Sequence, residues 1–205
     1  SRGVDLALFQ PGAKDGVRAL ATLARPILLY VGRVAVEKNI GAFLDLDAPG
    51  TKVVVGDGPQ RAALERAHPN VIFTGAKHGT DLARHYAAAD VFVFPSRTDT
   101  FGLVMLEALA CGIPVAAFPV PGPLDVVGAR GHGTVPGFTH GIGALDENLG
   151  HAVKRALAAS PADCRRYALH YSWPACATRF VENLVWAADG SCVVSTGDAR
   201  KVALG

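Results

Sequence analysis

Several features that would point to particular protein classes are missing from this sequence. No hydrophobic stretch approaches the roughly 18 to 20 residues that a membrane-spanning helix requires. The positive mean hydropathy of +0.25 therefore reflects alanine and short apolar runs. No signal peptide is recognisable. The four cysteines lie far apart and form no CxxC pair, which argues against a zinc site and a disulfide framework and favours a reducing compartment.

The sequence also lacks a large excess of positive or negative charge. The formal net charge is +2 at pH 7, which is too small to predict a nucleic-acid partner. Half of the residues are hydrophobic and 19% are charged, so the chain can bury a core and is not expected to be disordered. Its 205 residues suit one domain. Methionine occurs once, as Met105, and the chain has no initiating methionine, so we expect it to be a piece of a longer protein.

The hydrophobic pattern from residue 26 onward alternates between short apolar runs and helical periodicity. Buried strands that alternate with helices are typical of a parallel sheet covered on both faces, so we predict an α/β, Rossmann-like domain. Ligands of such folds bind at the carboxyl ends of the strands. The predicted strands are 27–31, 52–55, 71–74, 91–94 and 114–117; the predicted helices are 39–46, 59–67, 81–88, 102–110, 145–159 and 163–188, with a Pro/Gly loop at 119–123.

Residues 95–112 carry the strongest chemical signal. A polar loop with Asp99 leads into the helix predicted at 102–110, and Glu107 lies eight residues further on, inside that helix. Unpaired amides at a helix N-terminus bind anions. A carboxylate beside such a site repels phosphate, so Asp99 and Glu107 are better suited to accept hydrogen bonds from hydroxyls. The segment therefore predicts a site for a phosphorylated sugar.

The loop after the first predicted strand adds positive charge. Gly32 allows a ligand to approach the backbone closely. Arg33 and Lys38 can both reach a diphosphate, the arginine as a planar fork and the lysine as a point charge. A solvated loop in which Lys38 pairs with Glu37 is the alternative interpretation. The neighbouring Asp99 loop favours the diphosphate interpretation.

The glycine-rich loop at residues 56–58 invites comparison with a dinucleotide-binding fingerprint. It does not fit, because Arg61 stands where the third glycine belongs and the loop follows the second strand rather than the first. We predict a tight strand-to-helix turn there. Cys111 is interpreted as a small core residue.

Two histidines lie near the third predicted strand. His78 and His85 flank Asp81, but a metal site needs more converging ligands than these, so no metal is expected. Lys77 and His78 belong to a loop at the same sheet edge as Arg33. Contact of these two side chains with a nucleotide base is therefore a further hypothesis.

Together these residues match a known family. The chain resembles the C-terminal, nucleotide-sugar-binding domain of a GT-B-fold retaining glycosyltransferase of family 4, over roughly residues 3–187. The pattern is closest to bacterial α-mannosyl- and α-glucosyltransferases of glycolipid or polysaccharide synthesis. The segments that carry the resemblance are Gly3-Val4-Asp5 with Phe9 and Pro11, Val31-Gly32-Arg33, Glu37-Lys38-Asn39, Gly56-Asp57-Gly58-Pro59, Tyr86-Ala87 with Ala89-Asp90-Val91, residues 95–112, and Ser172-Trp173.

The resemblance implies a role for each site residue. Arg33 and Lys38 would hold the donor diphosphate and would be catalytic together with Asp99, which would contact the donor sugar. Glu107 would bind the ribose hydroxyls. The family motif has glutamate at both acidic positions, whereas Asp99 is one methylene shorter, and this bears on the identity of the sugar. The expected donor-binding residues, base contacts included, are Gly32, Arg33, Lys38, Lys77, His78, Asp99, Phe101, Gly102, Leu103 and Glu107.

The resemblance also implies partners and a domain layout. The donor would be a UDP- or GDP-sugar, and no metal or other cofactor is expected, because cationic side chains and the helix dipole would stabilise the departing diphosphate. Residues 1–11 would be an inter-domain hinge, 12–188 the nucleotide-sugar-binding domain and 189–205 a weakly patterned tail. The acceptor would bind an N-terminal domain that this chain lacks, so we expect the isolated chain to bind donor and transfer nothing. The full-length protein is expected in the cytoplasm, in peripheral contact with the inner face of the membrane.

Other functions share this architecture. A GT-B-fold epimerase or phosphorylase would act on the nucleotide sugar or on a sugar phosphate, and a non-catalytic module would only bind it. The presence of Arg33, Lys38 and Glu107 argues against an eroded, non-catalytic site. The base of the donor, its hexose, the acceptor and the oligomeric state stay open at this point.

Overall fold

A parallel sheet forms the centre of the computed structural model, which describes residues 3–99, 101–182, 184–186 and 192–194. The described strands of this sheet follow the order β3-β2-β1-β4-β5-β6. Every neighbouring pair in it is parallel. These strands are β1 Ile27–Val31, β2 Thr51–Val55, β3 Ile72–Gly75, β4 Val91–Phe94, β5 Val115–Ala117 and β6 Gly143–Leu145.

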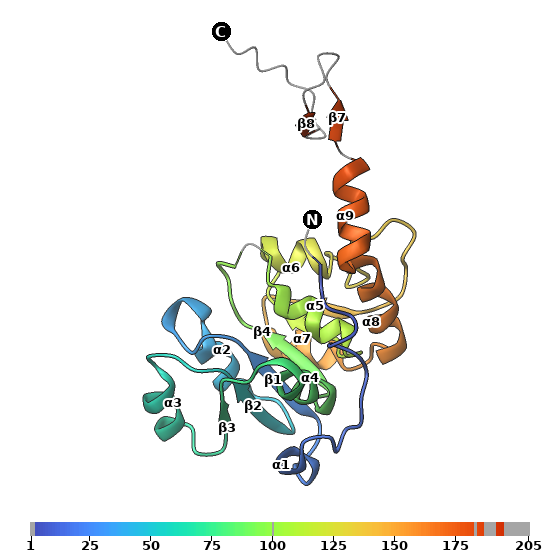
Figure 1. Ribbon diagram of the computed structural model, residues 1–205. Coiled ribbons are helices and arrows are strands. Elements are labelled where there is room, and N and C mark those ends of the chain that lie inside the picture. The colour runs from blue at the N-terminus through green and yellow to red at the C-terminus, as the bar shows by residue number, and fades with distance from the viewer. Residues whose placement is uncertain (1–2, 100, 183, 187–191, 195–205) are drawn as a thin grey trace.

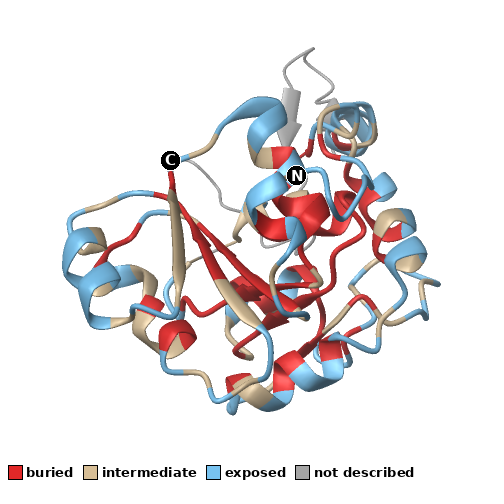
Figure 2. Ribbon diagram, turned by 90° about the horizontal axis from the view of Figure 1, so that it is seen from below, coloured by how far each residue is buried: buried red, intermediate tan, exposed pale blue. Residues whose placement is uncertain are grey.

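Helices cover both faces of the sheet, as the continuous burial of its central strands requires (Figure 1). On β1, Leu29 packs into the core beneath α4, α5 and α8, whereas Leu28 packs into the core beneath α2 and α7. Buried positions therefore lie in the middle layer and exposed ones on the outer sides of the helices (Figure 2). The helices are α1 Arg18–Ala21, α2 Ile40–Leu44, α3 Arg61–Ala67, α4 Gly79–Ala88, α5 Leu103–Ala110, α6 Pro121–Val126, α7 Leu149–Ala156, α8 Pro161–Ala168 and α9 Trp173–Glu182, with 3-10 turns η1 Val36–Lys38 and η2 Leu169–Tyr171.

The predicted α/β class and the five predicted strands are confirmed, but several boundaries were wrong. The helix predicted at 145–159 begins only after Asn148, whose side chain accepts a hydrogen bond from the His151 N–H (3.2 Å) and caps α7. The preceding residues form β6, a sixth strand that pairs with β5. The loop predicted at 119–123 contains the start of α6, because Pro121 occupies the first helical position, where its missing N–H costs no hydrogen bond.

The helix predicted at 163–188 is also divided. Ser172 is extended, and its hydroxyl accepts a hydrogen bond from the Ala175 N–H (3.1 Å), so α9 starts afresh after η2. Leu184–Trp186 is a strand, β7, which pairs antiparallel with β8, Cys192–Val194. The described part of the predicted tail is therefore a strand, and the rest of 189–205 lies outside the described residues.

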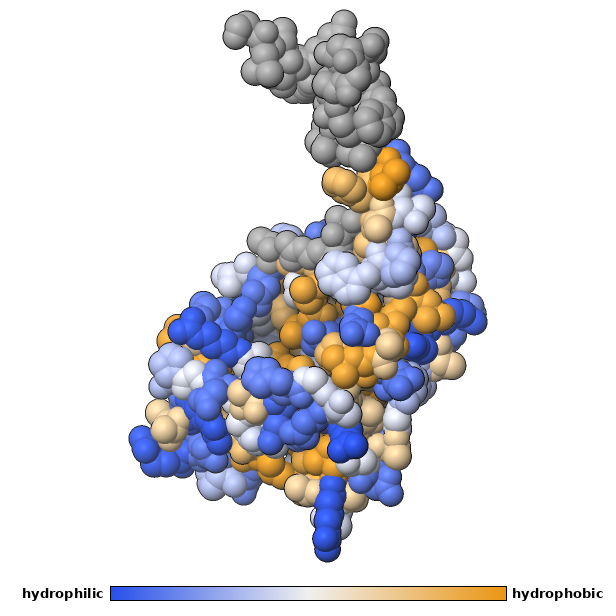
Figure 3. All heavy atoms as spheres, viewed as in Figure 1, coloured by the Kyte–Doolittle hydropathy of each residue, from blue (hydrophilic) through white to orange (hydrophobic). Residues whose placement is uncertain are grey.

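The described part of the predicted hinge packs against the last helices. The Val4 N–H donates to the Tyr171 carbonyl (2.8 Å), and the Arg165 guanidinium donates to the carbonyls of Leu6 (3.1 Å) and Phe9 (2.7 Å). A hinge role for residues 1–11 stays a prediction. The helix α9 rises away from the sheet (Figure 1), and hydrophobic side chains show at its far end in Figure 3. Within the described residues, no helix is long and apolar enough to cross a membrane.

Candidate functional site

Most of the predicted site residues lie where the connections of the sheet change direction. The chain leaves β1 for the face that carries α2, and leaves β4 for the face that carries α5. β1 and β4 are adjacent in the sheet, so the loops at their carboxyl ends diverge and leave a crevice between them. Such a reversal in strand order 3-2-1-4-5-6 is where ligands of doubly wound folds bind.

A hollow of about 200 Å³ opens between the β1 and β4 loops, and we call it the β4 hollow. It contains the predicted Gly32, Arg33, Lys38, Asp99 and Gly102, together with Leu103 at the start of α5. Its full lining is Tyr30, Val31, Gly32, Arg33, Lys38, Phe94, Ser96, Asp99, Gly102, Leu103 and Val104.

A second hollow of about 270 Å³, the β3 hollow, lies on the other side of the end of β1. The two hollows share Gly32 and Arg33, so they lie next to each other along the sheet edge. Lys77 and His78, which were predicted to contact a base, line the β3 hollow, and their role stays a prediction. Its full lining is Val31, Gly32, Arg33, Val55, Gly56, Asp57, Ala76, Lys77 and His78.

Gly102 determines how α5 enters the β4 hollow. It has a left-handed backbone with φ of 73° directly before the first residue of the helix. A Cβ there would lie 2.9 Å from Cζ of Phe94 and 3.0 Å from Cε of Met105. Both the conformation and the space therefore require glycine. The positive end of the α5 dipole faces the crevice as a result.

The cationic side chains of the site are each paired with a carboxylate. The Lys38 ammonium lies 2.6 Å from an oxygen of Asp99, with about a quarter of each side chain exposed (29% and 25%). Arg33 pairs with Glu37 at 3.4 Å in a much more exposed position. Lys77 likewise pairs with Asp81, at 3.5 Å. A diphosphate entering the crevice would therefore compete with these carboxylates for the same cations.

Two polar residues of the β4 hollow escaped the sequence analysis. The Tyr30 hydroxyl donates to the Arg33 carbonyl (2.8 Å), and burial raises the pKa of Tyr30 well above its ordinary value, with further contributions from Asp99 and Glu37. Ser96 is only 2% exposed, and its hydroxyl accepts a long hydrogen bond from the Thr98 N–H (3.4 Å). Tyr30 lies two positions before Gly32, and Ser96 lies within the loop that carries Asp99; these positions were the signal available in the sequence.

Glu107 lines neither hollow. It lies in the second turn of α5, and its Oε2 accepts a hydrogen bond from the hydroxyl of Tyr86 on α4 (2.9 Å). Burial raises the pKa of Glu107, and the Tyr86 hydrogen bond partly offsets this. The predicted Phe101 also lines neither hollow, and its partly buried side chain packs against the core that α4, α5 and α8 cover.

The glycine-rich loop after β2 is a tight turn, as predicted. An oxygen of Asp57 accepts a hydrogen bond from the Gly58 N–H (2.7 Å), and the other accepts one from Arg61 (3.1 Å). A Cβ on Gly56 would lie 1.8 Å from the Gly32 carbonyl oxygen, so the β1 and β2 loops approach closely only because glycine is present.

Over the described residues, no cluster of three or more histidine, cysteine, aspartate or glutamate side chains could hold a metal ion. The buried His85 instead contacts the Asp81 carbonyl through Nδ1 (2.7 Å). The prediction that the reaction needs no metal stays a prediction.

Comparison with known proteins identifies the family. The model for "Glycosyl transferases group 1" matches residues 25–158, which include both hollows and α5. The chain belongs to the glycosyl transferases group 1 family. It is similar to the GDP-mannose-dependent alpha-mannosyltransferase of Mycobacterium tuberculosis, at 41% identity over 182 residues that cover 85% of this chain and 47% of that protein. The protein of the same name from Mycolicibacterium smegmatis is 42% identical over 130 residues, which cover 62% of this chain and 35% of that protein.

A solved structure supports the same family assignment. Sucrose-phosphate synthase from Thermosynechococcus elongatus superposes with a TM-score of 0.66 at 30% identity, covering 88% of this chain and 50% of that one. These matches confirm the predicted fold class and the predicted glycosyltransferase domain. This group 1 glycosyltransferase chain spans less than half the length of the two curated mannosyltransferases.

Proposed function

We propose that this chain is the donor-binding part of a retaining glycosyltransferase and that its donor is GDP-mannose. The observation that carries the proposal is the pair of neighbouring hollows that meet at Gly32 and Arg33, with Lys38 and Asp99 on one side and Lys77 on the other. The similarity to two GDP-mannose-dependent enzymes supports the choice of guanine and mannose. Because GDP-mannose carries an α-linked sugar, an α-mannosyl product would mean retention.

The diphosphate would lie where the two hollows meet. Arg33 presents a planar fork and Lys38 a point charge, and the amino end of α5 faces the same space. In transfer, negative charge grows on the departing diphosphate, so groups held in place before the reaction stabilise that charge without reorganising. This arrangement would take the place of a metal ion, and metal independence is part of the proposal.

The sugar and the nucleoside would lie on opposite sides of that point. The Asp99 carboxylate borders the β4 hollow and would accept hydrogen bonds from the mannose hydroxyls. The base would lie in the β3 hollow beside Lys77 and His78. Glu107 would use its Oε1 for a ribose hydroxyl while Tyr86 holds its Oε2.

The acceptor would bind the part of the protein that completes the length of the curated relatives. We propose that the whole protein works in the cytoplasm at the inner face of the membrane, with a glycolipid or polysaccharide precursor as acceptor. The isolated 205-residue chain would bind donor and transfer nothing. Turnover by this chain alone, with any acceptor, would contradict that part of the proposal.

The binding site is tested by calorimetry with GDP, UDP and guanosine. A ligand that binds the native state also raises the melting temperature, so GDP should raise it more than UDP does. Replacing Arg33 with alanine should weaken GDP binding about tenfold or more and leave guanosine binding unchanged, because hydrogen bonds to charged groups contribute about 1.5–3 kcal/mol. Failure of both nucleotides to bind, or equal GDP affinity of wild type and variant, would overturn the site.

Reaction class needs a separate experiment on the full-length protein. Incubation with GDP-mannose and a lipid or glycan acceptor should give an α-mannosylated product. Conversion of GDP-mannose into an epimer in the absence of acceptor would replace transfer with epimerisation as the function of the same site.

A further inference from the structure

We infer that Asn39 is a positioning residue, which clamps the β1 loop to the end of β4 and thereby holds the Lys38 ammonium in place for a diphosphate. The inference rests on the proposed function of the crevice and goes further, because nothing in the family match assigns Asn39 a role. It acts through Lys38, and its own side chain does not line either hollow.

The backbone of Asn39 is exceptional. Among the described residues it is the only one other than glycine with a positive φ, at 51°. Asparagine tolerates the left-handed region better than most residues, yet the conformation still has an energetic cost. Asn39 ends the 3-10 turn η1 and directly precedes α2, so the break between these two helical segments falls at this one residue, just after Lys38.

The side chain of Asn39 joins the two loops that face each other across the crevice. Its Nδ2 donates to the carbonyl oxygen of Pro95 at 3.0 Å. Pro95 directly follows β4 and begins the loop that carries Asp99. A second bond crosses the same gap, because the Thr98 hydroxyl donates to the Glu37 carbonyl (3.3 Å). The two bonds anchor the residues on either side of Lys38.

This anchoring bears on Lys38 because a lysine side chain is long and flexible. With its backbone fixed at both sides, the Lys38 ammonium reaches Asp99 at 2.6 Å. Immobilising such a side chain during ligand binding costs about 0.5–1.5 kcal/mol, and a site that has already ordered it avoids this cost. Removing the Asn39 clamp should therefore weaken binding of the diphosphate and leave binding of the nucleoside unchanged.

Asn39→Gly separates the clamp from the backbone conformation, since glycine keeps the positive φ and removes only the amide. Calorimetry should find GDP bound about three- to tenfold more weakly and guanosine bound as by wild type. In a Lys38→Met background, the same substitution should change GDP affinity no further, because the residue through which it acts is absent. Asn39→Ala, which also strains the backbone, should lose at least as much GDP affinity.

Three results would overturn the inference: unchanged GDP affinity in Asn39→Gly, an equal loss for guanosine, or an equal loss in the Lys38→Met background. A measurement made without ligand tests the clamp independently of the proposed function. Acetylation of Lys38, followed by mass spectrometry, should be several-fold faster in Asn39→Gly, whereas the exposed Lys154 should react at an unchanged rate. An unchanged Lys38 rate contradicts the clamp, whereas a wild type that binds neither GDP nor UDP contradicts the proposed function.

Discussion

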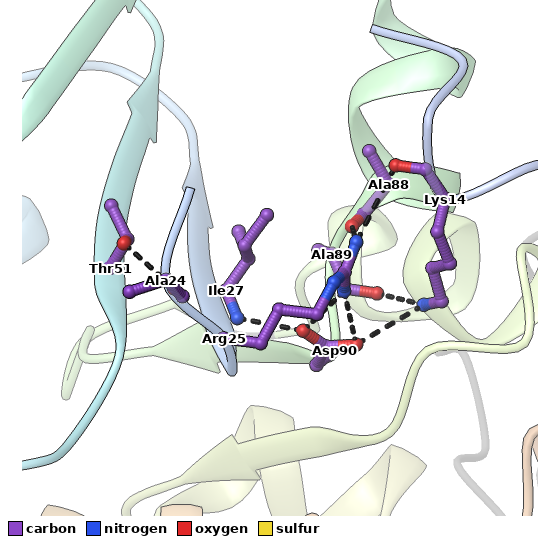
Figure 4. A network of polar contacts seen from close by, with 8 residues as sticks. All are labelled: Lys14, Ala24, Arg25, Ile27, Thr51, Ala88, Ala89 and Asp90. Carbon is purple, nitrogen blue, oxygen red and sulfur yellow. Dashed lines mark hydrogen bonds and ion pairs between the residues drawn. The ribbon is translucent and has the colours of Figure 1, made fainter. Parts of the chain in front are cut away.

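The two ends of the central strands carry the same kind of ion pair and use it differently. At the amino ends, Asp90 receives the Arg25 guanidinium on both oxygens at 2.6 Å, the Ile27 N–H at 2.7 Å and the Lys14 ammonium at 3.6 Å (Figure 4). At the carboxyl ends, Asp99 receives the Lys38 ammonium at 2.6 Å. The two aspartates are almost equally exposed, at 22% and 25% of the side chain.

Burial therefore does not distinguish these pairs, but the additional partners do. Arg25 also donates to the Ala88 carbonyl, and Lys14 donates to the Ala89 carbonyl, so the Asp90 cluster joins β1, β4 and the end of α4 through backbone groups. Burial lowers the pKa of Lys14, and Asp90 partly offsets this. The Lys38–Asp99 pair instead joins two side chains at the edge of a hollow. The Asp90 cluster ties two strands to the end of a helix, whereas the proposed role of the Lys38–Asp99 pair is to exchange partners with a ligand.

The largest predicted effect concerns the amino-end cluster. Asp90→Ala should lower the free energy of unfolding by about 3 kcal/mol, because it leaves cationic groups and a backbone N–H without their shared acceptor. The matched Asp99→Ala variant should lose about 1 kcal/mol or less. Urea denaturation followed by circular dichroism measures both. Equal losses in the two variants would remove the distinction between a structural and a ligand-binding pair.

The next effect concerns Glu107 and depends on pH. Burial raises its folded-state pKa above the unfolded value, so its stabilising contribution is fully present below the unfolded pKa and is lost as pH rises through the folded pKa. Ribose hydroxyls would bind the ionised form, so GDP affinity should rise over the same pH interval. The two trends have opposite signs because burial disfavours the charge that the ligand requires.

Glu107→Gln tests both trends. The variant should lack the decline in unfolding free energy with pH and should bind GDP about tenfold more weakly at neutral pH, with little dependence on pH. Denaturation and calorimetry at several pH values between about 4 and 8 span the ordinary carboxylate range and extend above it. Tyr86→Phe is the control, since it keeps the carboxylate and removes the bond to its Oε2. An unchanged pH profile in Glu107→Gln would assign the titration to another group.

Much of this arrangement was predictable because topology alone brings it together. Arg33 follows β1 and Asp99 follows β4, and parallel neighbours end at the same sheet edge. Strand β6 was missed because Gly143–Leu145 is short and lacks an apolar run, and its stability comes from pairing with β5. The sequence has no local signal for such a tertiary contribution.

Side-chain partners were harder to predict than positions. The bond between Asn39 and Pro95 joins residues 56 positions apart, and that between Glu107 and Tyr86 joins residues 21 positions apart. Each depends on the angle at which one element packs on another, which hydrophobic periodicity does not specify. Lys38 was predicted to bind phosphate, with a Glu37 pair as the alternative, whereas its partner in the structure is Asp99.

The smallest predicted effect refines the comparison at the Arg33–Glu37 pair. With 64% and 53% of the side chains exposed, this i,i+4 pair should contribute less than about 0.5 kcal/mol to folding. Glu37→Ala should therefore leave the urea midpoint of unfolding unchanged. It should tighten GDP binding about twofold, because it removes a negative charge near the diphosphate. The gain should shrink above about 0.1 M salt, where the screening length falls below about 10 Å. Glu65→Ala, which breaks a comparable pair with Arg61 on α3, should leave GDP binding unchanged. Weaker GDP binding in Glu37→Ala would instead mean that Glu37 orients Arg33, and the exposed pair would then belong to the site as Lys38 and Asp99 do.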